Sequence, residues 1–281
     1  MHCHVISPDQ ARFPRAPIGG KQSDWAASRP VTAEGLLALM DKTGIGQAVL
    51  VQATTAYGYD NSYVLDSCQR WPERFIAVGT VDPLRPDAGA RLPGICGDGG
   101  LAGVRLFTSG STVPTQGEWF AAPQTHDFWA AAGELDLTVC LQMRLGAATK
   151  QLISVLEQFP SVRVLLDHMG YPDIAASPAH AGREMAALAQ YPGLYLKLTH
   201  RNLEPLSDAG NEAIRFLEPV LGAFGAERIG WGSNCPAAEQ PLPELLELAK
   251  RVLDVVPAEA QDKIFAGTAR LLYPTLGKAA N

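Results

Sequence analysis

Two histidines stand two residues apart at the start of the chain. His2 and His4 belong to the run His2-Cys3-His4-Val5, which has the composition of a short strand. Side chains alternate along a strand, so both imidazoles are expected to point to the same side. Two imidazoles that face one cavity can bind a metal ion, or can bind and protonate an oxygen atom. The alternative is a frayed chain end that carries two surface histidines.

A third histidine directly follows a run of apolar residues. The sequence Asp167-His168-Met169-Gly170 comes immediately after the apolar run 164–166. This order places His168 at the carboxyl end of an expected strand, where barrel enzymes carry their catalytic groups. The alternative is a buried histidine whose hydrogen bonds serve only the structure.

Two other polar residues lie at or near the ends of expected strands. Asn234 follows the expected strand 229–232, which places it at the mouth of a barrel, unless it only forms a turn before Pro236. Arg105 lies near the end of the expected strand 103–107. A guanidinium there can hold a substrate carboxylate through two hydrogen bonds. A salt bridge across the barrel is the alternative for this arginine.

Further side chains at strand ends, or on the loops that follow, are expected to line the same cavity and bind the substrate. The ends of the second, fifth and seventh strands carry Gln52, Gln142 and Lys197. The following loops carry Tyr57, Arg144, Tyr171 and Arg201. No Ser-His-Asp order and no GxSxG sequence are present, so the chain is not expected to be a serine hydrolase.

Short apolar runs alternate with longer amphipathic segments along the chain. The expected strands cover residues 2–5, 47–52, 75–79, 103–107, 138–142, 163–167, 194–198 and 229–232. The expected helices cover residues 32–43, 60–71, 85–92, 125–136, 147–159, 179–190, 208–224 and 241–256. Thr32 and either Ser207 or Asp208 are predicted N-caps, and Gly44 and Gly225 are predicted helix stops.

Eight strands, each followed by a helix, close most simply into one (β/α)8 TIM barrel that spans residues 1–281. A doubly wound open sheet is the alternative, but no GxGxxG sequence follows an early strand. Loop 6–31 is rich in proline and glycine, so we expect it to stay non-helical and to fold over the barrel mouth. The tail from residue 257 is expected to add a C-terminal helix.

The composition narrows the class of protein. The chain has 281 residues, of which 47% are hydrophobic, and its net charge is −6. The length suits a barrel of roughly 250 residues. The acidic balance argues against nucleic acids and membrane surfaces as partners. The five cysteines are widely spaced and form no CxxC pair, which fits reduced thiols in a cytoplasmic enzyme.

These motifs together resemble the amidohydrolase superfamily, in the branch of 2-pyrone-4,6-dicarboxylate lactonase and related lactone hydrolases. The resemblance spans nearly the whole chain and rests on five runs: His2-Cys3-His4-Val5, Val51-Gln52-Ala53, Gly103-Val104-Arg105, Asp167-His168-Met169-Gly170 and Trp231-Gly232-Ser233-Asn234. It implies a hydrolase of a lactone or related cyclic ester. His2, His4 and His168 would then polarise the carbonyl and stabilise the oxyanion.

Three positions depart from the pattern of that family. Asn234 stands where the family usually has an aspartate that takes a proton from the attacking water, and an amide is not a useful base. Gln142 replaces a fifth-strand histidine, and Tyr171 stands in place of an arginine that binds a carboxylate. We therefore expect a small substrate with one carboxylate. Asn234 is expected to orient the water rather than to deprotonate it.

The resemblance leaves the cofactor and the reaction open. His2, His4 and His168 could hold one zinc ion, but the first expectation is no cofactor, because the branch also includes members that need no metal. The lost aspartate leaves three functions. One is a hydrolase in which a histidine acts as the base. The second is a lyase, decarboxylase or isomerase of a small acid, and the third is a barrel that binds without turnover.

Overall fold

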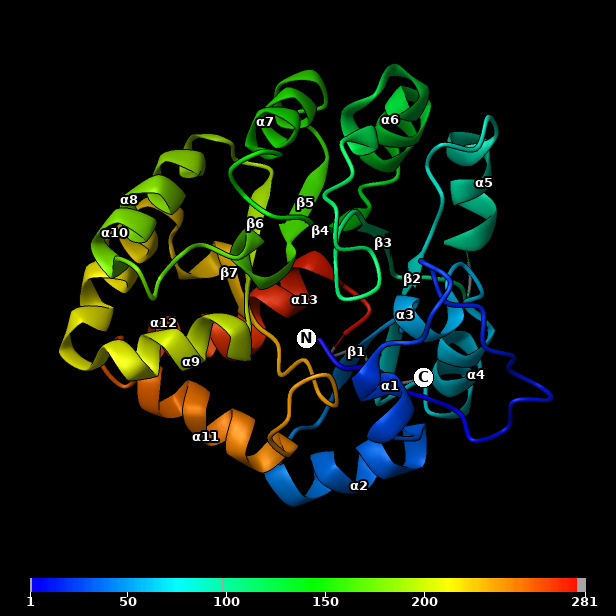
Figure 1. Ribbon diagram of the computed structural model, residues 1–281, viewed down its shortest axis with the longest axis horizontal. Coiled ribbons are helices and arrows are strands. Elements are labelled where there is room, and N and C mark those ends of the chain that lie inside the picture. The colour runs from blue at the N-terminus through cyan, green and yellow to red at the C-terminus, as the bar shows by residue number, and fades with distance from the viewer. Residues whose placement is uncertain (1, 98, 277–281) are drawn as a thin grey trace.

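Seven parallel strands form one curled sheet in the computed structural model, which describes residues 2–97 and 99–276 (Figure 1). The strands follow one another across the sheet in chain order. They are β1 (Ala48–Val51), β2 (Phe75–Thr80), β3 (Gly103–Phe107), β4 (Thr138–Gln142), β5 (Arg163–Leu166), β6 (Leu194–Leu198) and β7 (Ile229–Trp231). Each overlaps a predicted strand, because continuous apolar runs suit parallel strands that are covered on both faces.

The two edges of this sheet meet at Cys3. Cys3 forms isolated parallel bridges with Leu50 of β1 and with Cys235, which follows β7. The amide of His4 donates a hydrogen bond to the carbonyl of Cys235 at 2.8 Å. The predicted strand 2–5 is therefore wrong in its length, since only these bridges remain of it in the described part of the chain. Cys3 nevertheless lies between β1 and the segment after β7, where closure of the sheet in chain order requires it.

Helices connect the strands and surround the sheet (Figure 1). The longer ones are α2 (Ala33–Thr43), α4 (Ser62–Arg70), α5 (Ala88–Ile95), α6 (His126–Glu134), α7 (Thr149–Gln158), α8 (Pro178–Ala187), α9 (His200–Ala209), α10 (Ile214–Phe224) and α11 (Leu242–Leu253). Apart from α9, each corresponds to a predicted helix. Thr32 caps α2 as predicted, because its side chain accepts a hydrogen bond from the amide of Gly35.

Helix α9 corrects the prediction that a loop follows β6. It begins with a capping box: the Thr199 side chain accepts from the amide of Asn202, and the Asn202 side chain accepts from the amide of Thr199 at 3.1 Å. Asparagine at the third position is a weaker sequence signal than the usual glutamate or glutamine. Ser207 and Asp208 lie inside α9, so neither is the predicted N-cap of the next helix.

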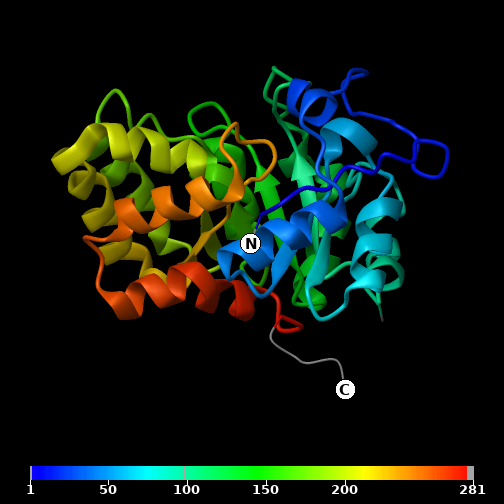
Figure 2. The same ribbon diagram turned by 90° about the horizontal axis from the view of Figure 1, so that it is seen from below.

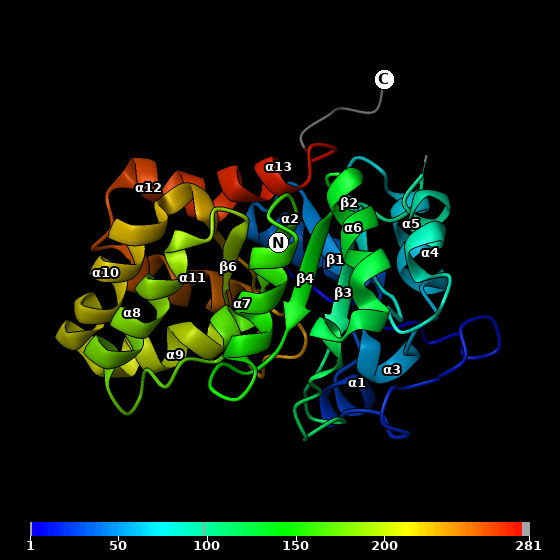
Figure 3. The ribbon, with the colours of Figure 1, turned by 90° about the horizontal axis from the view of Figure 1, so that it is seen from above.

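Short helices lie at both ends of the sheet. At the carboxyl ends of the strands are α1 (Asp24–Ser28) and α3 (Thr54–Tyr57) (Figures 2 and 3). At the opposite end are α12 (Ala258–Asp262) and α13 (Thr268–Leu272). The prediction of no helix within 6–31 is wrong for α1, whereas the tail is helical as predicted.

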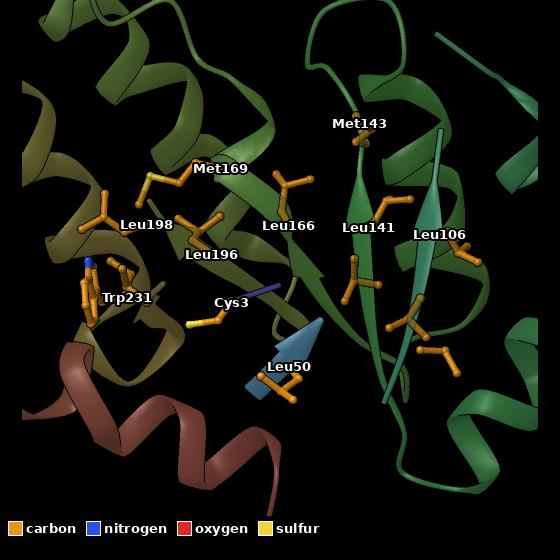
Figure 4. Packing of buried hydrophobic residues seen from close by; sticks show 14 of the residues in the cluster. Cys3, Leu50, Leu106, Leu141, Met143, Leu166, Met169, Leu196, Leu198 and Trp231 are labelled. Atoms are coloured by element: carbon orange, nitrogen blue, oxygen red, sulfur yellow. The ribbon is translucent and has the colours of Figure 1, made fainter. Parts of the chain in front are cut away.

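Alternation along the strands separates two apolar clusters. Val49 and Val51 of β1 share one cluster with Cys140 and Leu165, and Tyr273, just after α13, packs into it. The strand residues between them belong to the larger cluster that contains the buried faces of the helices. Figure 4 shows several of these residues, among them Leu50, Leu141 and Leu166. The sheet is therefore covered on both faces, as its apolar sequence predicts.

Two properties of the whole chain concern its cysteines and the length of its apolar helices. All five cysteines are free thiols, as their spacing predicts. Among the residues that the structure describes, no helix is long and apolar enough to cross a bilayer.

Gly232 lies where the chain after β7 passes the first histidine. A Cβ at this position would lie 2.5 Å from the Cβ of His2. Replacing Gly232 with alanine should displace the segment that joins the two sheet edges and lower the free energy of unfolding by about 1–3 kcal/mol. Urea unfolding followed by circular dichroism measures this loss.

Gly222→Ala is the matched control, because a Cβ at Gly222 in α10 meets no atom within 4 Å. Alanine favours a helix over glycine, so this variant should be at least as stable as the wild type. If Gly232→Ala unfolded at the same urea concentration as Gly222→Ala, the close passage at Gly232 would not matter to the fold.

Candidate active site

The imidazole of His4 has a fixed orientation at the carboxyl end of the sheet. Its Nδ1 lies 2.8 Å from the carbonyl oxygen of Val51. Its Nε2 lies 3.1 Å from His2 Nε2 and 3.2 Å from Asn234 Oδ1. A carbonyl oxygen can only accept, so Nδ1 carries the proton and Nε2 is the atom of His4 that can take up another.

Burial keeps His2 and His4 neutral. It lowers the pKa of His4 to about 4, and the charge of Arg105 adds to the effect. It lowers the pKa of His2 well below its ordinary value, with the charge of Lys197 as the second cause. With the proton of His4 on Nδ1, a proton taken up by its Nε2 would lie between two Nε2 atoms that are 3.1 Å apart. The pair is therefore available as a proton acceptor near neutral pH.

His168 enters the site through a turn with unusual backbone angles. The chain leaves β5 through the short 3-10 helix η3 (Asp167–Gly170), in which φ is 55° at His168 and 53° at Met169. Such left-handed conformations are uncommon for residues other than glycine, and they cluster at functional sites. The turn lifts the imidazole away from the line of the strand and toward the cavity.

The partners of His168 favour one tautomer. Its Nδ1 lies 2.8 Å from Thr199 Oγ1, and that oxygen already accepts a hydrogen bond from the amide of Asn202. If the Thr199 hydroxyl donates to Nδ1, the imidazole proton stays on Nε2 and can be donated to a ligand. Burial lowers the pKa of His168 well below its ordinary value, against the opposite effect of Asp167. His168 therefore offers a neutral N–H donor.

A buried carboxylate binds two cations at the ends of β3, β5 and β6. Asp167 accepts from Lys197 Nζ at 2.6 Å and from Arg105 Nε at 2.9 Å, and all three side chains are buried. Although burial raises its pKa, the charges of Lys197 and Arg105 hold the pKa of Asp167 well below its usual range. Two cations and one anion leave one net positive charge, which opposes protonation of the nearby imidazoles.

These groups border a cavity of about 730 Å³. Three of the four predicted catalytic residues line it: His4, His168 and Asn234. Five of the eight predicted substrate-binding residues line it as well: Arg105, Gln142, Arg144, Tyr171 and Arg201. The carboxyl ends of curled parallel strands meet at one mouth, which brings residues that are far apart in the sequence together.

The other four predicted residues lie outside the cavity lining: His2, Gln52, Tyr57 and Lys197. Gln52 donates from Nε2 to the carbonyl of Asp60. The Tyr57 hydroxyl accepts from the guanidinium of Arg15 at 2.7 Å. Gln52 and Tyr57 therefore hold loop segments together, and their predicted contact with a substrate stays a prediction.

The cavity lining carries charges of both signs. The guanidinium carbons of Arg144 and Arg201 lie 4.8 and 6.0 Å from the ring centre of Tyr171. The Tyr171 hydroxyl accepts from Gln142 Nε2 at 3.2 Å, and burial raises the pKa of Tyr171. The acidic residues of the lining are Asp24, Glu204 and Glu239. The cavity can therefore bind an anionic group and also accept hydrogen bonds from neutral polar groups.

The sequence predictions miss several lining residues, among them Trp25, Glu204 and Gln240. Trp25 belongs to α1 and stacks on His4 with ring centres 5.2 Å apart. The sequence predicts a loop over residues 6–31, so no predicted strand end points to Trp25. Glu204 lies one turn after His200 in α9, so recognising the capping box of that helix would have brought Glu204 to the mouth.

The donor set does not complete a metal site. The Nε2 atoms of His2 and His4 are close enough to contact one ion. However, residues 2–97 and 99–276 contain no group of three His, Cys, Asp or Glu side chains that could hold one. The predicted third ligand, His168, does not join them in such a group. Asn234 offers a neutral amide, and the net positive charge around Asp167 disfavours a further cation.

Known proteins resemble this chain in sequence and in structure. An L-fucono-1,5-lactonase from Burkholderia ambifaria is 26% identical over 220 residues, which are 76% of this chain and 72% of that protein. A Pseudomonas putida protein described as a 2-pyrone-4,6-dicarboxylic acid hydrolase has a TM-score of 0.79 at 22% identity, over 98% of this chain and 96% of that one. A zinc-bound amidohydrolase from Burkholderia multivorans has a TM-score of 0.73 at 20% identity, over 97% of each chain.

The structural likenesses show that the curled sheet and its helices have the fold of amidohydrolase TIM-barrel proteins. The model of the amidohydrolase family matches residues 1–275. This range includes all seven strands and every residue that lines the cavity. The match confirms the resemblance that the five strand-end motifs suggest. The chain therefore belongs to the amidohydrolase family.

Proposed function

We propose that this amidohydrolase-family hydrolase opens a small lactone by adding water to the ring carbonyl. The observation that carries the proposal is the convergence of neutral His4, neutral His168 and the Arg105 guanidinium on one cavity. A neutral imidazole can take a proton, and a fixed cation can stabilise negative charge on an oxygen. Hydrolysis of a cyclic ester needs both functions close together.

His4 is the general base in this mechanism. Its Nδ1 is held by Val51, so its Nε2 takes the proton from the attacking water. Asn234 Oδ1 lies 3.2 Å from Nε2 and accepts the N–H that forms. His2 Nε2, 3.1 Å away, can accept the same N–H when the proton of neutral His2 lies on Nδ1, which is 3.7 Å from Asp167 Oδ1. Asn234 thus acts as a positioning residue that stabilises protonated His4, and the site keeps a base without the aspartate of the family.

The lactone carbonyl binds to His168 and Arg105. His168 donates from Nε2, and Arg105 is held in place by Asp167 and Gln142. The water oxygen bonds to the carbonyl carbon, and the ring C–O bond then breaks. The proton held by His4 passes to the leaving oxygen. The product is an open-chain hydroxy acid. Its new carboxyl group lies beside Arg105 and becomes a carboxylate when it releases its remaining proton to the solvent.

The charges of the cavity lining favour a substrate with no more than one carboxylate. Arg144 and Arg201 flank Tyr171 and can bind one anionic group. Asp24 and Glu204 line the same cavity and would repel a second one. The Burkholderia ambifaria relative, an L-fucono-1,5-lactonase, supports a lactone of this less acidic kind.

A panel of lactones with zero, one or two carboxylates tests the reaction. We expect ring opening of at least one lactone with zero or one carboxylate. His4→Gln should lower kcat by roughly 10²–10⁴ because it removes the base. The exposed His180 in α8 provides the control, and His180→Gln should keep full activity. Release of CO2 from a small acid, with no lactone opened, would contradict the proposal and favour a lyase.

The pH dependence of kcat/KM tests the identity of the base. Only neutral His4 can take a proton, and its pKa is lowered to about 4. The rate should therefore stay level from neutral pH down to about pH 5 and then fall tenfold per pH unit below about pH 4. Circular dichroism at each pH establishes that the protein is still folded. A fall that begins near pH 6.5, the ordinary pKa of histidine, would exclude buried His4 as the base.

Metal analysis tests the cofactor. The described donor set lacks a complete group of three ligands, so protein purified without chelator should contain much less than one zinc ion per chain. Lactone hydrolysis should survive prolonged dialysis against a chelator. One zinc per chain, together with loss of activity that added zinc restores, would overturn this expectation.

A further inference from the structure

Part of the cavity lining carries a polar atom that no protein group satisfies. Gln240, in the loop between β7 and α11, donates from Nε2 to Glu204 Oε1 at 3.0 Å. The other end of the same amide, Oε1, is buried and has no hydrogen-bond partner among the described residues. Gln240 and Glu204 both line the cavity. A buried acceptor without a donor is costly, so a ligand that supplies the donor is favoured.

His200 adds a second such atom beside this pair. It stands at the start of α9, four residues before Glu204, so the two side chains lie on the same face of the helix. The His200 side chain lines the cavity, is only 6% exposed, and its Nδ1 has no partner in the part of the chain that the structure describes. Burial lowers the pKa of His200 to about 4, and the charge of Arg201 adds to this, so the ring is neutral at neutral pH.

The chemistry of these three side chains selects one kind of ligand group. The Glu204 carboxylate and Gln240 Oε1 can only accept hydrogen bonds, whereas neutral His200 can donate from one ring nitrogen and accept at the other. A hydroxyl group both donates and accepts, so it can pair with any one of the three, and several hydroxyl groups can satisfy them together. A carboxylate has no proton to donate, and Glu204 would repel it. A plain hydrocarbon ring would leave the buried atoms unpaired.

We propose that His200, Glu204 and Gln240 form a subsite for substrate hydroxyl groups, which makes a polyhydroxylated lactone the preferred substrate class. This inference rests on the proposed lactone hydrolysis for its substrate, but the subsite itself can bind without turnover. The subsite rejects an analogue without hydroxyls, because the buried polar atoms of the protein would then stay unpaired.

Binding of lactams tests the subsite, because a lactam keeps the ring of a lactone and resists hydrolysis. The probes are a polyhydroxylated δ-lactam and the unsubstituted δ-lactam, each titrated by calorimetry. The wild-type protein should bind the hydroxylated probe more tightly. Gln240→Leu should raise the Kd of the hydroxylated probe by about tenfold and leave the Kd of the unsubstituted probe unchanged. Glu218→Gln, on the exposed side of α10, is the control and should change neither Kd.

The outcomes separate the subsite from the proposed reaction. Equal affinity of the wild-type protein for both lactams would overturn the subsite, and so would an equal loss of both affinities in a Gln240→Leu protein whose melting temperature is unchanged. Discrimination between the lactams that depends on Gln240, together with no hydrolysis of any lactone, would support the subsite and contradict the hydrolase proposal.

Discussion

The Asp167 carboxylate, buried between the Lys197 ammonium and the Arg105 guanidinium, is the interaction on which the rest of the site depends. It joins the ends of three strands, since each partner comes from a different one. Removing the carboxylate would leave two buried cations without a counter-ion, which costs about 3–5 kcal/mol. With all three groups in place, one positive charge remains. Burial keeps the imidazoles of His2, His4 and His168 neutral. The charge of Lys197 adds to this at His2 and the charge of Arg105 adds to it at His4, whereas Asp167 acts in the opposite direction at His168.

The neutral imidazoles then differ in role because their hydrogen-bond partners differ. The Val51 carbonyl fixes a proton on Nδ1 of His4 and leaves its Nε2 to exchange protons. The Thr199 hydroxyl favours the opposite tautomer in His168, which leaves an N–H donor. Asn234, whose φ is 59°, turns its amide oxygen toward His4. One base and one donor at the same cavity are the elements that our proposed lactone hydrolysis requires.

The sequence predicts the strand-end residues well, because apolar runs fix where each strand stops and alternation fixes which side chains face inward. His4, His168 and Arg105 follow from these rules and converge as expected. These rules fail where contacts between distant parts of the chain determine the local structure. The strand around His2 shrinks to bridges at Cys3. Helix α9 starts at an unusual capping box, so Glu204 is missed. Trp25 reaches the cavity from the short helix α1, whose place over the strand ends no local sequence pattern encodes.

Nitrogen-15 NMR of the imidazole side chains in the uniformly labelled protein is the most direct test of the central claim, that burial holds His2, His4 and His168 neutral. Between pH 5 and pH 8 the account predicts that none of these three rings gains a proton, that His4 shows the tautomer protonated on Nδ1, and that His168 shows the one protonated on Nε2. Protonation of any of the three rings near pH 6.5, or the reversed tautomer in His4, would contradict it.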